Sequence, residues 1–205
     1  MRVLVAGLIG GILMFVWGVI AHMALGLGEV GLRLPASENI ALSGLQQGLG
    51  GQAGVYILPS LDPKKMRDAA EVRAYSIKAV RSPYAWVVYQ PQGTDMTQMG
   101  PQIGRQWASD TLAALALAFV MGLAGLGFRR RLAVAAAAAV FAWLSTLLPY
   151  WNWYRFPLDF TLAALAEQLI GWLIAGAAMA WWLGRRGTLS VTDVPRARMT
   201  GSAPR

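Results

Sequence analysis

Two ionisable residues, His22 and Glu167, fall inside long apolar runs and are the side chains best placed to do chemistry. An ionisable group at membrane depth is costly, so it normally faces a helix interface or a water-filled cavity. At about 1.5 Å per residue, we expect Glu167 about 12 Å, and His22 about 7 Å, inside the outer ends of their helices. With the neighbouring Gln168, they form a candidate proton or cation site that opens outward.

A structural role for the same residues competes with this hypothesis. A neutral Glu167 could bond to Ser145, to Thr146 or to a backbone carbonyl and so hold two helices together, with His22 simply interfacial. Such polar contacts between membrane helices contribute about 0.6 kcal/mol on average. We favour this structural role over an ion site.

The remaining chemical inventory excludes several classes of function. The chain contains no cysteine and one histidine. It therefore lacks disulfides, thiolate nucleophiles and zinc–thiolate sites, and it cannot hold a haem between two histidines. Neither a catalytic carboxylate pair nor a metal-ligand set is visible in the sequence. We expect a protein that is not an enzyme and has no cofactor or metal.

The composition is that of a membrane protein. Hydrophobic residues make up 56% of the 205 residues and charged residues 14%, whereas soluble domains carry about 25% charged residues. The net charge is +8, but the arginines lie beside apolar runs, where the positive-inside rule places them. The basic charge therefore indicates membrane topology, and we expect lipids but no nucleic acid as partners.

Four apolar runs predict a bundle of four transmembrane helices, over residues 3–27, 112–128, 132–148 and 159–183. The second helix is expected to begin before the bilayer, near residue 100. Each run is long enough to cross a hydrocarbon core of about 30 Å. Small residues allow close approach of helices in lipid. They predict packing faces on the first two helices at Gly7, Gly10, Gly11, Gly18, Gly122, Gly125 and Gly127.

An aromatic stretch separates the last two apolar runs. We predict an outer hairpin over residues 149–159, in which Pro149 ends one helix and Asp159 caps the next. Indole and phenol rings settle at the membrane–water interface. The expected interface residues are Tyr150, Trp151, Trp153 and Tyr154 outside, and Trp181 and Trp182 inside. A lipid or quinone site at this hairpin is a weaker alternative.

The basic residues predict which side of the membrane each end faces. Three arginines form a predicted turn between the second and third helices, and two more follow the fourth: Arg129, Arg130, Arg131, Arg185 and Arg186. By the positive-inside rule, we expect a multi-pass protein of the cytoplasmic membrane with both termini in the cytoplasm. The tail, residues 185–205, lacks apolar periodicity and is predicted to be a disordered basic segment.

Residues 28–108 are predicted to form a small extracytoplasmic α+β domain between the first two helices. We expect a helix over 38–49 capped by Ser37, a strand over 54–58, a helix over 64–80 begun by Asp62-Pro63, and a strand over 84–89. This order suggests a βαβ-like unit. Because an isolated strand pair is marginal in water, the domain should lean on the membrane helices, on a second copy or on a partner.

Several short motifs resemble those of a family of uncharacterised bacterial four-span inner-membrane proteins. They are Trp17-Gly-x-x-x-His22, Gly28-Glu29, Gly54-Val-Tyr-x-x-Pro59 and Tyr150-Trp-Asn-Trp-Tyr-x-Phe-Pro157. The resemblance covers residues up to about 184 and transfers no catalytic or binding residue, since it implies no known activity. Our first hypothesis is therefore a non-catalytic accessory or assembly component whose external domain meets a protein partner or a second copy. The alternative is a small proton- or cation-linked permease that uses Glu167 and His22.

Overall fold

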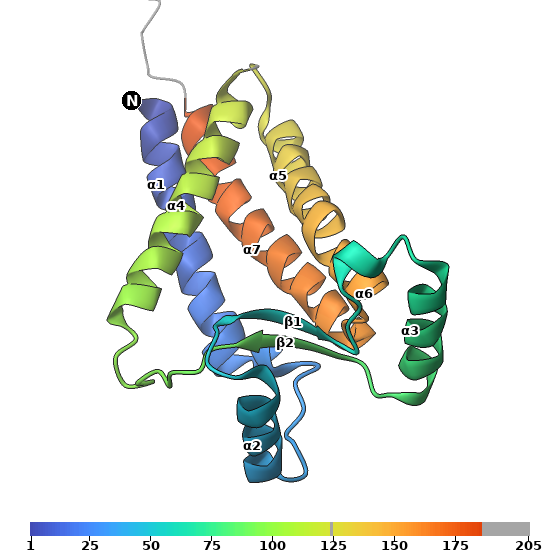
Figure 1. Cartoon of the computed structure of the whole chain (residues 1–205). Helices are drawn as coiled ribbons and strands as arrows, with labels where there is room; N and C mark the ends of the chain where they lie inside the picture. The colour runs from blue at the N-terminus through green and yellow to red at the C-terminus, as the bar shows by residue number, and fades with distance from the viewer. Residues whose placement is uncertain (124, 186–205) are drawn as a thin grey trace, which may run out of the picture. The chain divides into compact units, whose positions relative to one another are not determined.

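A computed structural model describes residues 1–123 and 125–185 of the chain (Figure 1). Within these residues, four helices are long and apolar enough to cross a membrane: Arg2–Ala24, Gly100–Leu123, Phe128–Tyr154 and Leu158–Gly184. The four predicted apolar helices are thereby confirmed, and they support the membrane character expected of the protein. The described residues also include one small two-stranded sheet.

The chain divides into two compact units. Unit 1 comprises Met1–Leu25, Arg105–Ala142 and Leu165–Arg205, of which the structure describes residues up to 185. Unit 2 comprises Gly26–Gly104 and Trp143–Ala164. The division shows that the predicted domain between the first two spans is joined in one unit by the segment that links the last two.

Unit 1 is built from four helices. They are α1 (Arg2–Val19), continued by a widened π turn, η1 (Ile20–Ala24); most of α4 (Gly100–Leu123); α5 (Phe128–Ala142); and most of α7 (Leu158–Gly184). The core consists of alanine, methionine and one leucine: Ala6, Ala114, Leu117, Ala118, Met121, Ala135, Ala175 and Met179. Small side chains let the helix backbones approach closely, which is how helices associate in lipid.

The predicted glycine packing face of the first helix is confirmed at three positions and wrong at Gly18. A Cβ atom placed on Gly7 would lie 2.8 Å from the Cα of Leu115, and one on Gly11 would lie 2.6 Å from the Cα of Thr111. Gly10 meets the side chain of Met179 in the same way. No atom of the described chain lies within 4 Å of a Cβ on Gly18. The row of glycines on the first helix therefore extends beyond the part of the helix that packs closely against its neighbours.

The same limit holds on the second helix. A Cβ on Gly122 would meet the side chain of Val3, whereas Gly125 and Gly127 have open space within the described residues. The last two lie between α4 and α5 rather than on a helix face. They serve the turn between the helices and not a packing face, so that part of the prediction is wrong.

Unit 2 contains α2 (Glu38–Leu49), β1 (Gly54–Leu58), the 3₁₀ turn η3 (Pro63–Lys65), α3 (Ala69–Arg81) and β2 (Ala85–Tyr89). The strands pair antiparallel, with Gly54 opposite Tyr89 and Leu58 opposite Ala85. The predicted order of strand, helix and strand is confirmed, but the parallel βαβ arrangement is wrong. The connection over residues 59–84 is long enough to return the chain in either direction, so spacing alone does not determine strand direction.

The sequence predicts one helix that begins at Asp62-Pro63, but the structure has two separate elements there, each capped by its own aspartate. The carboxylate of Asp62 accepts a hydrogen bond from the amide of Lys64 at 2.9 Å and caps only the turn η3. The carboxylate of Asp68 accepts one from the amide of Ala70 at 2.8 Å and begins α3. The predicted start at residue 64 is therefore wrong, because a second capping aspartate follows six residues later.

The helix of the third span continues through Pro149 instead of ending there. After α5 come a second π turn, η4 (Trp143–Leu147), and α6 (Leu148–Tyr154). A proline is tolerated in the first turn of a helix, where its missing N–H leaves no bond unmade. The predicted hairpin over 149–159 therefore reduces to a short turn at residues 155–157, in which Arg155 has φ of 56°. Asp159 lies in the first turn of α7 and not before it.

The two-stranded sheet is supported by α6. The ring of Trp86 on β2 lies 4.0 Å from the ring of Tyr154 and 6.2 Å from that of Tyr150, measured between centroids. The ring of Tyr150 in turn lies 5.3 Å from that of Phe156. The strand pair was expected to need support from the membrane helices, a second copy or a partner. In the described residues, α6 at the end of the third span provides that support.

Replacing Trp86 by alanine is expected to loosen the sheet. The change removes two ring–ring contacts and the apolar area between β2 and α6, a loss of about 1–2 kcal/mol. Limited proteolysis in detergent should then cut residues 50–90 faster than in the wild type. The control is Trp153→Ala, since the Trp153 side chain is 74% exposed. Equal cleavage rates for the two variants would contradict the support role of Trp86.

Candidate functional site

The predicted pair of membrane-embedded ionisable residues is in direct contact within unit 1. The Nε2 atom of His22 lies 3.0 Å from the Oε1 atom of Glu167. His22 is carried by the π turn η1, and Glu167 lies nine residues after the start of α7 at Leu158. A π turn adds a residue to the helical turn and re-aims the side chains after it, and such turns are frequent at functional sites.

Trp17 also contacts Glu167, through the main-chain carbonyl of the glutamate. Its indole Nε1 donates a hydrogen bond to the main-chain carbonyl of Glu167 at 2.9 Å. The ring lies against Gly171, where a Cβ atom would stand 2.5 Å from the indole Cδ1. Two side chains of the first span, those of Trp17 and His22, therefore bond to Glu167 of α7. The sequence singled out this pair of residues as a motif, but the part played by Trp17 was missed.

The pair is open on the histidine side. The His22 side chain is 56% exposed and that of Glu167 is 22% exposed. Asp110 on α4 lies within electrostatic range of Glu167, and its carboxylate accepts a hydrogen bond from Gln106 at 3.0 Å. Three helices of unit 1 thus place ionisable groups in one region. Within the described residues, no group of three or more histidine, aspartate or glutamate side chains is arranged to hold a metal ion.

This arrangement suits the transfer of a proton. A histidine and a carboxylate 3.0 Å apart can share one proton between them. With that proton the pair is neutral overall, either as imidazolium and carboxylate or as imidazole and carboxylic acid, which lowers the cost of placing it at membrane depth. Loss of the proton leaves one negative charge, which then favours a cation.

Gln168 is not part of this contact. Its side-chain oxygen accepts a hydrogen bond from the indole of Trp172 on the same helix at 3.0 Å. Of the three residues proposed for the site from the sequence, the structure brings together His22 and Glu167. The ion-binding role of all three remains a prediction.

The predicted interface aromatics divide into two groups. Tyr150 and Tyr154 pack against Trp86, whereas Trp151 and Trp153 are exposed. At the far end of α7, Trp181 is exposed. Trp182 packs against the core of unit 1, and its Nε1 is buried without a hydrogen-bond partner among the described residues. The packing role of Tyr150 and Tyr154 against Trp86 was not predicted from the sequence.

The arginines expected to mark topology also differ from one another. Residues 129–131 form the first turn of α5 instead of the predicted turn between helices. Arg131 is 9% exposed, and its guanidinium donates to the carbonyls of Met121, at 3.3 Å, and of Ala180, at 3.4 Å. Arg129 and Arg130 are exposed, and Arg186 lies outside the described residues. The structural role of Arg131 was missed, because charge alone does not distinguish it from its two neighbours.

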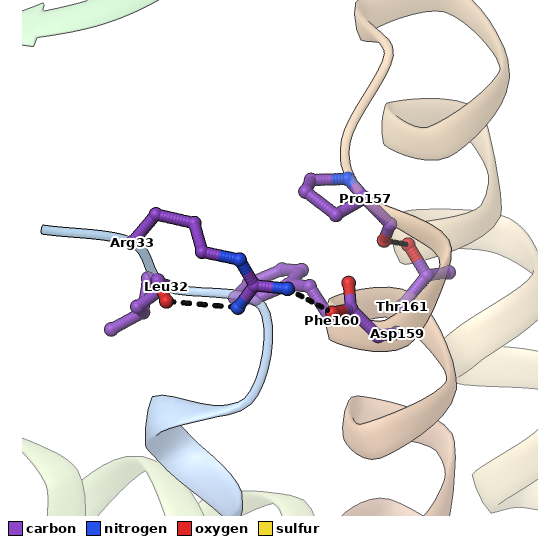
Figure 2. A network of polar contacts seen from close by, with 6 residues as sticks. All are labelled: Leu32, Arg33, Pro157, Asp159, Phe160 and Thr161. Carbon is purple, nitrogen blue, oxygen red and sulfur yellow. Dashed lines mark hydrogen bonds and ion pairs between the residues drawn. The ribbon is translucent and has the colours of Figure 1, made fainter.

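In unit 2, the chain that follows the first span is joined to the start of α7 (Figure 2). One nitrogen of Arg33 donates to the carboxylate of Asp159 at 2.8 Å and the other to the carbonyl of Leu32 at 3.0 Å. Gly31 has φ of 85°, and a Cβ there would lie 2.5 Å from that of Phe160. Because the ion pair is exposed, it chiefly orients the loop.

The comparisons with known proteins add no assignment to these residues. No family model, curated protein or solved structure matches the chain. Its function must therefore be inferred from the chemistry and placement of its own side chains.

Proposed function

We propose that the protein is a non-catalytic component of a bacterial inner membrane, and that residues 28–108 contact a partner protein or a second copy outside the cytoplasm. The main support is an exposed apolar patch beside Trp86 on one face of the sheet, formed by Val55, Ile57 and Val88. Val55 and Val88 are opposite each other in the strand register and are 57% and 69% exposed. Of the described residues of α2 and α3, none is buried. A segment with so little core gains stability by covering this face.

The orientation follows from the distribution of arginine. With Arg129, Arg130 and Arg131 at the start of the third span, the positive-inside rule favours both termini in the cytoplasm. A reporter fused after Arg205 should therefore be active only in the cytoplasm, and one inserted at Gly93 only outside it. The reverse pattern would overturn both the orientation and the proposed location of residues 28–108.

Purification in mild detergent tests the partner. The wild-type chain should retain a stoichiometric partner or form a homo-oligomer. The double change Val55→Thr and Val88→Thr should abolish that association, because it makes the sheet face polar while keeping β-branched side chains. The control is Val80→Thr, an exposed valine on α3 outside that face. A folded wild-type monomer without any partner would refute the proposal.

A second candidate function is a proton-linked carrier. The contact between His22 and Glu167 favours it, because a shared proton at membrane depth is a means of coupling proton movement to that of a solute. The exposed histidine side would face the outer solution, and Trp17 would hold the glutamate in place.

Reconstituted vesicles test this candidate. Glu167→Gln keeps the shape of the side chain but removes its titration, so it should abolish proton flux driven by a pH gradient, at least tenfold below the wild type. The control is Glu29→Gln, the same chemical change at an exposed carboxylate between α1 and α2. Flux that Glu167→Gln leaves unchanged would eliminate the carrier.

A further inference from the structure

One end of unit 1 gathers most of the cationic side chains of the described bundle, while Arg105 lies near the opposite end of α4. The start of α1, the end of α4, the start of α5 and the end of α7 meet there (Figure 1). Val3 packs at Gly122, and Arg131 bonds to the carbonyls of Met121 and Ala180. The cationic side chains at this end, here called the basic end, are those of Arg2, Arg129, Arg130, Arg131 and Arg185.

Negative charge is distant from the basic end. The acidic residues in the described part of unit 1 are Asp110 and Glu167. Counted along their helices, Asp110 lies about 17 Å from Met121 and Glu167 about 20 Å from Ala180. No side chain of the described unit 1 therefore neutralises these arginines at close range.

The N-terminus of α5 adds to the positive charge at the basic end and so favours a bound anion. The N-terminus of a helix carries partial positive charge and is stabilised by acidic residues or bound anions. The first turn of α5 has no acidic residue and carries three arginines instead. Arg131 is buried and donates two hydrogen bonds to helix carbonyls, whereas Arg129 and Arg130 are exposed, with like charges beside the helix terminus.

Arg185 is held in a position suited to bind a phosphate. Its guanidinium lies 4.3 Å from the ring centroid of Trp181 and 5.7 Å from that of Trp182. Stacking on an aromatic face leaves the N–H edge of the guanidinium free for a bidentate contact with phosphate oxygens. Tryptophan at the end of a span also lies at headgroup depth.

We propose that the basic end binds the headgroup phosphate of an anionic phospholipid, with Arg185 and the exposed arginines Arg129 and Arg130 as its ligands. A lipid is the occupant, because the site lies at the ends of membrane-spanning helices, where acyl chains pack beside the bundle. Arg131 supports the helix ends beneath the headgroup and is not itself a ligand. This site is independent of the proposed partner face and of the His22–Glu167 pair.

The test uses the full chain in a non-ionic detergent, with native mass spectrometry and thermal stability as readouts. The probes are short-chain phosphatidylglycerol, phosphatidylcholine of the same chain length, and inorganic phosphate. Wild-type protein should bind phosphatidylglycerol at least tenfold more tightly than phosphatidylcholine, and 0.5 M salt should reduce that preference. The double change Arg129→Gln and Arg185→Gln should weaken phosphatidylglycerol binding roughly twenty-fivefold, at about fivefold for each arginine.

The control is Arg73→Gln with Arg81→Gln, which lowers the net charge equally on α3 in unit 2. It should leave binding of phosphatidylglycerol unchanged. Equal affinity of the wild type for the two lipids would overturn the proposal even if the double variant fails to fold. Inorganic phosphate that competes fully at the same concentration would also overturn it, since the site would then take a small anion. Equal losses in the test and control variants would show only a general effect of net charge and refute the assigned ligands.

Discussion

Replacing Arg131 by alanine is expected to lower the free energy of unfolding by about 3 kcal/mol, the largest effect of any single arginine described. Its guanidinium is buried and donates to the carbonyls of Met121, near the end of α4, and Ala180, near the end of α7. The carbonyl of Met121 is one of the last four of α4, which lack partners within the helix, and a cation near the end of either helix is also favoured by the helix dipole. Without Arg131, these buried carbonyls lose their charged donor and the two helix ends lose their link.

Titration of sodium dodecyl sulfate into mixed micelles, followed by tryptophan fluorescence, measures this change. Arg130→Ala is the control, because Arg130 is exposed one residue away, and it should shift stability by less than about 0.5 kcal/mol. Arg131→Lys should recover less than half of the loss, since an ammonium group lacks the planar fork that reaches two carbonyls. Equal effects of the alanine changes at positions 130 and 131 would show that the bonds to α4 and α7 contribute little.

Adding a methyl group at Gly11 should destabilise unit 1 by about 2 kcal/mol. The Cβ atom of Gly11→Ala would lie 2.6 Å from the Cα of Thr111, and a backbone atom cannot move aside as a flexible side chain can. The two helices must therefore separate, which reduces contacts along the whole packed face. The same mixed-micelle titration measures the loss.

Gly18→Ala is the matched control for this prediction. Gly18 is two turns further along the same face of α1, and a Cβ there meets no described atom within 4 Å. Alanine has a higher helix propensity than glycine, so stability should be unchanged or rise by up to about 1 kcal/mol. If both glycine changes destabilised the protein equally, close approach at Gly11 would not be the cause.

Much of the local structure is determined by the sequence alone. Four spans follow from the length and hydropathy of four runs, because a backbone in lipid must satisfy its own hydrogen bonds as a helix. The helix at 38–49 and the strand at 54–58 were predicted with the observed bounds, since a glycine pair and Pro59 terminate them locally. His22 and Glu167 were identified because an ionisable residue in an apolar run is costly wherever its neighbours lie.

The tertiary structure alone decided which groups meet. It paired His22 with Glu167, placed Trp17 on the glutamate carbonyl, and buried Arg131 while leaving Arg129 exposed. It also set the antiparallel direction of the strands. A sequence records which side chains avoid water, but lipid and a neighbouring helix are equally apolar. The pattern therefore cannot distinguish a glycine that touches another backbone from one that faces open space, and only the packing of distant segments resolves the two.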